Sequence, residues 1–311
     1  MNKEENCAKQ EETINYAKDY LTECKKSKIN VANSSFCYFA HWGQTLGTAK
    51  LKLKINGKKY FFSYLKIIIF NFFGVSTLSN YIIKKHNIEN KKFKYFIITN
   101  VSKKDFRNDG SCFDPCFQTN SKKLPNALWF LNCVDNYIPK KFDKNLIIFT
   151  RKNKGSRHDL IFLIISFLRA LIKYKFSIKN IIHEFSFYSQ FSNIISDKIL
   201  SEISKGNFKQ VINSYEAQPF QNNVFKKIKK FNNKIKTVGF FHTALSPIAT
   251  SLLYRSGAPD SLLISGSYSK KYLSKYLNWP KKKIRIVPSF RYNKKNISDM
   301  AGFIYLPFNI F

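Results

Sequence analysis

The sequence predicts an α/β protein built on a Rossmann-like parallel sheet, with helices on both faces of that sheet. Short apolar runs rich in β-branched and aromatic residues recur along the chain, and each is typical of a buried strand. Longer stretches with helical spacing separate them, so that strands and helices alternate from Lys209 to Arg291. Strict alternation of this kind favours parallel strands joined by right-handed crossovers.

Seven apolar runs are the main predicted strands. They occupy residues 94–99, 127–131, 145–149, 210–213, 237–241, 261–264 and 284–287. Two further strands are expected nearer the ends of the chain, within residues 29–39 and at residues 302–307. Residues 51–60 have hairpin character and turn at Asn56-Gly57, a dipeptide typical of two-residue hairpin loops.

Helices are predicted where apolar residues recur with helical spacing. In residues 11–26, for example, Ile14, Ala17, Leu21 and Cys24 share one face. The other predicted helices cover residues 61–86, 160–173, 178–204, 223–233, 247–255 and 267–277. We expect the first of these to be broken near Gly74.

Two of these regions are unusually apolar. Residues 60–73 are interrupted by Lys66 and Asn71, and Arg169 is the one charged residue within residues 160–172. Both are shorter than the ~20 residues that span a bilayer. We therefore expect buried helices, the second of them central to the core, while the mixture of aromatic and basic residues leaves a membrane-surface contact open.

The predicted elements divide the chain into three parts. Residues 1–28 form a helical extension, residues 29–295 form one Rossmann-like domain, and residues 296–311 begin a second α/β domain that is incomplete. No internal repeat or low-complexity linker divides the central part.

The charge of the chain is very basic, at a formal +34. Most of it comes from lysine, because the chain has only seven arginines. Lysine is accompanied by many Asn, Ile and Phe residues, which share AT-rich codons, so codon bias explains part of the charge. The field still favours anionic membranes, nucleotides and acidic polymers.

Cysteine usage and the first residues of the chain bear on location. The six cysteines are irregularly spaced in a long chain, which favours reduced thiols over a disulfide framework. Cys112 and Cys116 are the only close pair and make a weak zinc candidate, so no metal site is predicted. Residues 1–20 are polar and lack the apolar core of a secretory signal. We expect a cytoplasmic protein, with the inner face of the membrane as a possible place of action.

Polar or ionisable residues follow the last four predicted strands. Because the carboxyl ends of parallel strands meet at one edge of a sheet, these residues should converge on one rim, where ligands of such sheets bind. Any one of them alone is more often an ordinary loop residue. The rim candidates are Tyr215, Glu216, His242, Thr243, Ser265, Gly266 and Arg291.

Two loops add weaker candidates. Residues 100–123 form a long loop that contains Asp109 and Asp114, which could serve acid/base chemistry or hold a metal ion. A solvated, turn-forming loop is the favoured interpretation. Residues 151–157 form a basic turn between a strand and a helix, where phosphate often binds, but the turn lacks P-loop and dinucleotide-binding spacing.

Five short segments, in their order and spacing, resemble the bacterial surface-carbohydrate glycosyltransferase-like proteins. The similarity spans roughly residues 94–306. The segments are Asp109-Gly-Ser-Cys-Phe-Asp114, Ser214-Tyr-Glu-Ala-Gln-Pro-Phe220, Val238-Gly-Phe-Phe-His-Thr243, Pro259-Asp-Ser-Leu-Leu-Ile-Ser-Gly266 and Val287-Pro-Ser-Phe-Arg291.

The resemblance implies a GT-B-like architecture of two facing Rossmann-type domains. In such enzymes the amino-terminal domain mainly holds the acceptor and the carboxy-terminal domain mainly holds the nucleotide sugar. This chain would supply the acceptor side and the opening strand of the donor side, so a separate chain could complete the cleft. The implied reaction transfers a sugar from a nucleotide-sugar donor to a saccharide or lipid-linked acceptor in surface polysaccharide biosynthesis. It needs no bound cofactor.

Glycosyl transfer needs a base for the acceptor hydroxyl and positive groups for the departing phosphate. His242 is the first candidate for the base because histidine titrates near neutral pH. Glu216 is the second, either as the base or by orienting His242. Arg255 and Arg291 are expected to contact phosphate. The remaining expected substrate contacts are Tyr215, Gln218, Thr243, Ser265, Gly266, Asp109 and Asp114.

Two other functions fit the sequence. One is a non-catalytic basic protein that binds anionic lipid or nucleic acid, for which residues 226–236 and 281–295 are the most basic segments. The scarcity of arginine and the lack of a known nucleic-acid motif argue against specific nucleic-acid recognition. The other is an inactive acceptor-domain fragment whose catalytic partner domain is missing.

Overall fold

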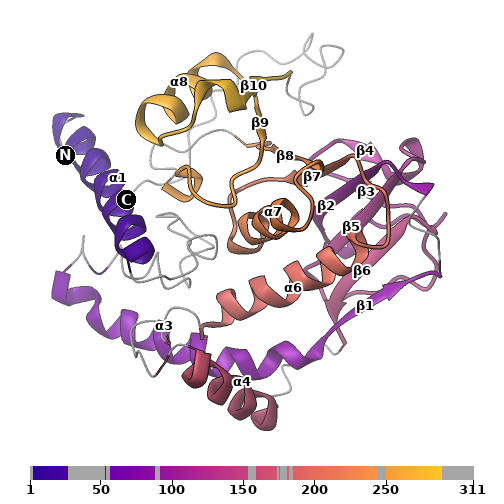
Figure 1. Cartoon of the computed structure of the whole chain (residues 1–311), viewed down its shortest axis with the longest axis horizontal. Helices are drawn as coiled ribbons and strands as arrows, with labels where there is room; N and C mark the ends of the chain where they lie inside the picture. The colour runs from indigo at the N-terminus through magenta and orange to yellow at the C-terminus, as the bar shows by residue number, and fades with distance from the viewer. Residues whose placement is uncertain are drawn as a thin grey trace.

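The computed structural model (Figure 1) describes residues 3–26, 53, 57–87, 92–152, 159–173, 175, 181, 185–243 and 250–288. These residues form a mixed α/β fold around an eight-stranded sheet with the order β1-β6-β5-β2-β7-β8-β9-β10. The strands are β1 (Tyr81–Lys85), β2 (Tyr95–Val101), β5 (Ala127–Cys133), β6 (Leu146–Arg151), β7 (Gln210–Ser214), β8 (Lys236–Phe240), β9 (Ser261–Ile264) and β10 (Ile284–Ile286). All neighbours pair in parallel except β1 and β6.

The strand order reverses beside β2. From β2 the chain places β5 and then β6 on one side, and afterwards returns to add β7 through β10 on the other side. In register, Phe96 of β2 lies opposite Leu128 of β5 and opposite Val211 of β7. The reversal therefore falls between β2 and β7, and ligands of doubly wound sheets bind at such a point. The predicted Rossmann-like fold class is confirmed.

One face of the sheet is covered by α-helices. Phe96 and Phe130 of the sheet are fully buried in the same apolar core as Ile199 and Val224. The helices that contribute to this core are α1 (Lys3–Lys26), α6 (Phe187–Ile203), α7 (Pro219–Phe231) and α8 (Ser267–Tyr276). Their burial against β-branched and aromatic strand residues supplies the main stabilisation of the domain.

Irregular connections cover the opposite face of β2, β5 and β6. They contain the 3₁₀ turns η6 (Lys103–Asp105) and η7 (Ser121–Lys123) and a small antiparallel pair, β3 (Phe113–Asp114) with β4 (Thr119–Asn120). A second core forms there, in which Trp129 and Leu131 are buried beside Phe117. The long loop after β2 is therefore an ordered layer over the sheet.

The seven predicted strands between residues 94 and 287 are confirmed, with boundaries that shift by two residues at most. Five helices are confirmed in position, although α1 and α7 begin earlier than predicted and α6 covers the later part of its range. Helix α4 (Leu160–Lys173) has the predicted bounds. In the range 247–255 the described residues contain only the short 3₁₀ turn η8 (Thr250–Leu252).

The prediction for residues 61–86 was wrong in its second half. Helix α3 (Phe61–Gly74) ends at Gly74, as expected, but it is followed by the 3₁₀ segment η4 (Val75–Asn80) and then by strand β1. The apolar run Tyr81-Ile-Ile continues the apolar helix without Pro or a charged break, so periodicity does not reveal the change. Residues 81–85 form a strand because they pair with β6.

Two further expectations, for residues 51–60 and for residues 160–173, were also wrong. Residues 57–60 form the 3₁₀ turn η3 (Gly57–Tyr60), so the described part of the expected hairpin is not a strand. Helix α4 was expected at the centre of the core, yet only Leu163 and Ala170 of its side chains are buried. Helix α4 packs against η4 and not against the sheet. The short segment η4 covers only the side of α4 that carries Leu163 and Ala170.

The expected strands at 29–39 and 302–307 lie outside the described residues. The same holds for residues 296–311, the expected start of a second domain.

Candidate functional site

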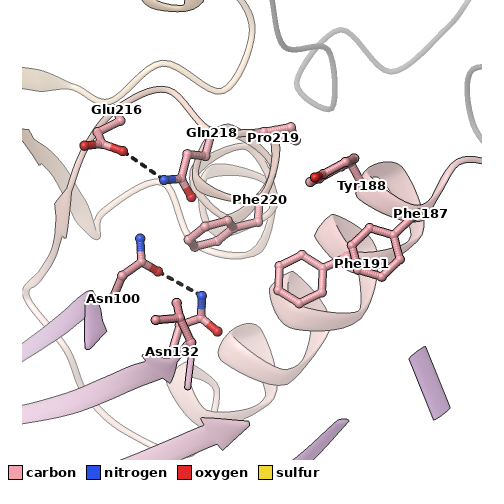
Figure 2. Close-up of a pocket in the computed structure, with 10 residues that line it drawn as sticks. Asn100, Asn132, Phe187, Tyr188, Phe191, Glu216, Gln218, Pro219 and Phe220 are labelled. Atoms are coloured by element: carbon pink, nitrogen blue, oxygen red, sulfur yellow. Dashed lines mark hydrogen bonds between the residues drawn. The ribbon is translucent and has the colours of Figure 1, made fainter. Parts of the chain in front are cut away.

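A cavity of about 280 Å³ opens at the reversal between β2 and β7 (Figure 2). Its walls come from the ends of β2 and β5, from the turn between β7 and α7, and from the first two turns of α6. The lining residues are Asn100, Asn132, Val134, Phe187, Tyr188, Phe191, Glu216, Gln218, Pro219 and Phe220. The cavity thus lies where the strand order predicts a ligand.

Two asparagines form one side of the cavity. Asn100 of β2 and Asn132 of β5 are directly opposite each other in the parallel register. The side-chain Nδ2 of Asn132 donates a hydrogen bond to Oδ1 of Asn100 over 2.8 Å. Each amide retains donor or acceptor capacity for a ligand, because a single bond uses only part of the capacity of a carboxamide.

An aromatic wall faces the amides. Phe187, Tyr188 and Phe191 project from the first two turns of α6, and Phe220 of α7 lies between them and the asparagines (Figure 2). Phe191 and Phe220 meet edge to face with ring centroids 6.4 Å apart. Ser186 begins α6 as its N-cap and accepts a hydrogen bond from the N–H of Ser189. The cap fixes the first residue of α6 and therefore the positions of the aromatic side chains along the helix.

The turn between β7 and α7 is held by the side chain of Gln221. Its Oε1 accepts hydrogen bonds from the backbone N–H groups of Glu216 at 2.9 Å and Gln218 at 3.0 Å. Its Nε2 donates to the Ser214 carbonyl at 2.7 Å and to Asn213 Oδ1 at 3.1 Å. One buried amide therefore fixes the backbone that carries Glu216 into the cavity.

Tyr215 and Arg255 support the same turn from inside and are not surface contacts. The Tyr215 hydroxyl donates to Asn222 Oδ1 at 2.6 Å. Arg255 is 5% exposed, and its guanidinium donates to the carbonyls of Ala217, Ser251 and Leu253. We expected Tyr215 to contact substrate and Arg255 to contact phosphate. Burial corrects both expectations, because neither side chain reaches the cavity and both stabilise the conformation of the turn.

Glu216 and His242, the two expected catalytic residues, lie side by side. Glu216 Oε1 is 3.7 Å from His242 Nε2, and Glu216 Oε2 accepts a 3.0 Å hydrogen bond from Gln218 Nε2. Glu216 lines the cavity, whereas His242 follows β8 and packs behind Glu216 with little exposure. The structure thus brings together three of the expected site residues, Glu216, Gln218 and His242.

Cys116 also reaches this group. Its Sγ lies 3.5 Å from His242 Nε2. Cys116 was considered with Cys112 as a weak zinc pair, but Cys112 is buried in the core over the sheet. Within the described part of the chain, no group of three or more His, Cys, Asp and Glu side chains is arranged to hold a metal ion.

Asp114 positions Cys116 and does not line the cavity. Asp114 Oδ1 accepts hydrogen bonds from the backbone N–H groups of Cys116 at 2.6 Å and Phe117 at 2.8 Å. Burial raises the pKa of this carboxyl group, although the Phe117 N–H and the Thr99 hydroxyl favour its ionised form. Phe117 stacks on Phe240 of β8 with ring centroids 5.4 Å apart, so the loop after β2 packs over the end of β8.

Asp109 lies on the outer part of that loop. Its carboxylate pairs with Lys122 Nζ at 2.8 Å and accepts hydrogen bonds from Ser111. The hydrogen bond from Lys122 is the largest of the effects that lower the pKa of Asp109. The structure gives this residue a local role in the turn, as the sequence favoured, and no place in the cavity lining.

Three further rim candidates, Thr243, Ser265 and Gly266, do not line the cavity. Thr243 is exposed directly after His242. Ser265 and Gly266 follow β9, two strands from β7, and Gly266 has a φ of 91° at the N-cap of α8 with open space where a Cβ would be. Arg291 lies outside the described residues.

Sequence reasoning missed most of the cavity lining. Asn100 and Asn132 are polar residues near the ends of two apolar strands, and that signal was present. The aromatic residues of α6 carry no comparable signal, because helix periodicity alone does not separate a cavity wall from a core.

A second, open hollow of about 560 Å³ lies beyond the end of β2. It is lined by Ser102, Lys103, Lys104 and Asp135.

Comparisons of this chain with protein-family models, with curated proteins and with solved structures find no match.

Proposed function

We propose that the cavity binds a saccharide and that Glu216 activates one of its hydroxyl groups for transfer of a sugar from a nucleotide-sugar donor. The observation that carries the proposal is the position of Glu216, which lines the cavity and lies against His242. Carboxamides and a carboxylate suit hydroxyl groups, and aromatic rings suit the apolar faces of a sugar ring. The resemblance of the surrounding segments to surface-carbohydrate glycosyltransferases supports the same chemistry.

The reaction assigns separate roles to the two residues. Glu216 accepts the proton of the acceptor hydroxyl as the new bond forms between that oxygen and the anomeric carbon of the donor. The bond from the anomeric carbon to phosphate breaks, and the nucleotide (a nucleoside diphosphate, or CMP from a CMP sugar) leaves with the electron pair of that bond. His242 positions Glu216, since it lies behind the carboxylate and is not among the cavity residues. The sequence favoured His242 as the base, and the geometry favours Glu216.

Binding calorimetry on the full chain tests the first half of the proposal. A panel of saccharides and UDP, GDP, CMP and CDP sugars would be titrated into the wild type and into Asn132→Ala. We expect saturable binding of a saccharide or nucleotide sugar that weakens about tenfold in the variant, as the loss of one or two hydrogen bonds predicts. Glu12→Gln, on the exposed face of α1, is the control and should bind as the wild type does.

Two results would contradict the proposal. One is no binding of any panel member by a chain shown to be folded, and the other is binding that Asn132→Ala leaves unchanged. The first would favour the inactive-fragment or basic-binding alternatives, and the second would place the ligand outside the cavity.

A further inference from the structure

Helices α3 and α4 expose an unusual amount of apolar surface. On α3 the exposed apolar side chains are Phe61, Phe62, Leu65, Ile69, Phe70 and Phe73. On α4 they are Leu160, Ile161, Ile164, Ile165, Leu168 and Ile172. Ile161 is 72% exposed and Phe62 is 80% exposed. Clusters of this kind on a folded surface mark contact sites for proteins or membranes.

The two helices belong to one unit that projects from the sheet. Phe72 of α3 and Phe167 of α4 meet edge to face with ring centroids 5.4 Å apart, and both rings pack on Phe185. Leu163 and Ala170 of α4 are buried in the same small core. Figure 1 shows this unit at the lower left, on the opposite side of the molecule from β3 and β4. We call the unit the α3–α4 surface.

The charged side chains of α3 and α4 are all positive, and the acidic residue directly before α4, Asp159, accepts a hydrogen bond from the Phe162 N–H at the start of that helix. Helices α3 and α4 contain no Asp or Glu. Exposed basic residues border or interrupt their apolar faces, namely Lys58, Lys59, Lys66, Arg169 and Lys173. An apolar helix face edged by lysine and arginine complements the acyl boundary and the anionic headgroups of a lipid leaflet. The net charge of +34 adds long-range attraction to such a surface.

We propose that the α3–α4 surface docks on an anionic lipid bilayer, with both helices lying in the headgroup region. Residues 57–80 are, within the described chain, the one stretch long and apolar enough to cross a membrane. The stretch is divided into η3, α3 and η4, and Val75, Ser76, Thr77 and Leu78 are buried in the protein. A segment whose last part belongs to the protein core fits a surface contact better than a span.

The α3–α4 surface is connected to the cavity through its small core, against which Phe187 and Phe191 of the cavity lining pack. A Cβ on Gly74, at the end of α3, would lie 3.2 Å from Cβ of Phe187, which lines the cavity. The docked helices would therefore hold the aromatic wall close to the lipid surface. This step rests on the proposed function: a saccharide linked to a lipid would enter the cavity from the membrane side.

Vesicle co-sedimentation with the full chain tests the docking itself, independently of sugar transfer. The probes are vesicles of phosphatidylcholine alone and of phosphatidylcholine mixed with phosphatidylglycerol. Ile161→Glu with Ile172→Glu should lower binding to the anionic vesicles about a hundredfold, since each substitution removes one inserted side chain. Tyr268→Glu is the matched control, because Tyr268 of α8 is 75% exposed, as is Ile172. It should bind as the wild type does.

A charge variant separates lipid from other occupants of the surface. Lys66→Gln with Arg169→Gln should weaken binding to the anionic vesicles and leave the weaker binding to neutral vesicles unchanged. Docking is overturned if the wild type fails to bind anionic vesicles, or if Ile161→Glu with Ile172→Glu binds as the wild type does. It is equally overturned if light scattering shows that the wild type is a dimer and that Ile161→Glu with Ile172→Glu converts the dimer to monomer. The surface would then bind a second copy of the chain.

Discussion

Glu216 and His242 extend from the carboxyl ends of neighbouring parallel strands, and their side chains meet there with Oε1 3.7 Å from Nε2. Strands β7 and β8 pair in a register that places Ser214 opposite Phe240, two residues before each member of the pair. The equal offset places the two residues at matching positions beyond the ends of their strands. The meeting of carboxylate and imidazole thus follows from strand register.

His242 is predicted to affect transfer more than binding. His242→Ala removes the group behind Glu216 but no residue of the cavity, so saccharide affinity should stay within about threefold of the wild type. The rate of transfer should fall about tenfold to a hundredfold, because the carboxylate loses its fixed orientation. Steady-state kcat and KM, measured separately, check this. A rise in KM with unchanged kcat would show that His242 binds the substrate.

Tyr215 is predicted to act through the fold. Tyr215→Phe leaves Asn222 Oδ1 buried without the hydroxyl donor it now has, and this should lower the free energy of unfolding by about 1–3 kcal/mol. Urea denaturation followed by circular dichroism measures the effect. Tyr268→Phe, on the exposed side of α8, is the control and should change stability by less than about 0.5 kcal/mol. Equal effects from both would contradict the assigned role of Tyr215.

Two glycines with similar backbone angles are predicted to differ sharply on substitution. Gly257 and Gly266 have φ values of 87° and 91°. A Cβ on Gly257 would collide with the backbone carbonyl of Asn222, in the first turn of α7, whereas a Cβ on Gly266 would meet open space.

Gly257→Ala should therefore cost about 3 kcal/mol or more, from a steric clash added to strain, and Gly266→Ala about 1–2 kcal/mol from strain alone. The midpoints of thermal unfolding rank the two variants. A Gly266→Ala protein as unstable as Gly257→Ala would contradict the packing described around Asn222.

Glu202 of α6 gives a pH-dependent prediction. Burial alone would raise the pKa of Glu202, but hydrogen bonds from Lys85 of β1 at 2.7 Å and from Lys205 at 2.9 Å outweigh burial and lower it. A lowered pKa in the folded state stabilises the protein above the pKa of the unfolded carboxyl group, and this contribution is lost as the pH falls through the folded pKa.

Glu202→Gln should then lower the free energy of unfolding by about 1–2 kcal/mol at neutral pH, with the difference shrinking below about pH 4. Urea denaturation at a series of pH values follows that difference. Glu12→Gln should show no such trend. A Glu202→Gln deficit that is constant across the pH range would mean that packing, and not charge, is lost.

The sequence revealed the sheet more fully than it revealed the edges of the fold. Central strands such as Phe96–Ile98 are buried on both faces, so their apolar character is continuous and easily read. Strand β1 was missed because Tyr81–Ile83 is as apolar as the preceding helix, and only pairing with β6 makes it a strand. Helix α4 was placed in the core because its apolar sequence alone does not show that most of its side chains are exposed.

The site was anticipated in part for similar reasons. Glu216 and His242 follow strands, and the rule for parallel sheets places such residues on one rim. Tyr215 was expected on the rim by the same rule, and Arg255 was expected to contact phosphate. Tertiary packing turns both side chains inward, where Tyr215 bonds Asn222 and Arg255 bonds the Ala217 carbonyl. Asn132 lies within a strand that is otherwise apolar, and its amide is exposed to the cavity only because β5 neighbours β2 at the point of reversal.

The central claim is that Glu216 accepts the proton of a saccharide hydroxyl during sugar transfer. The most direct measurement is the rate of nucleotide release from the donor identified by calorimetry, in the presence of acceptor, for the wild type, Glu216→Gln and the Glu12→Gln control. We predict that Glu216→Gln, which keeps the size of the side chain, lowers the rate by about a hundredfold or more with unchanged stability, while Glu12→Gln matches the wild type. A Glu216→Gln protein that transfers sugar at the wild-type rate would contradict the claim.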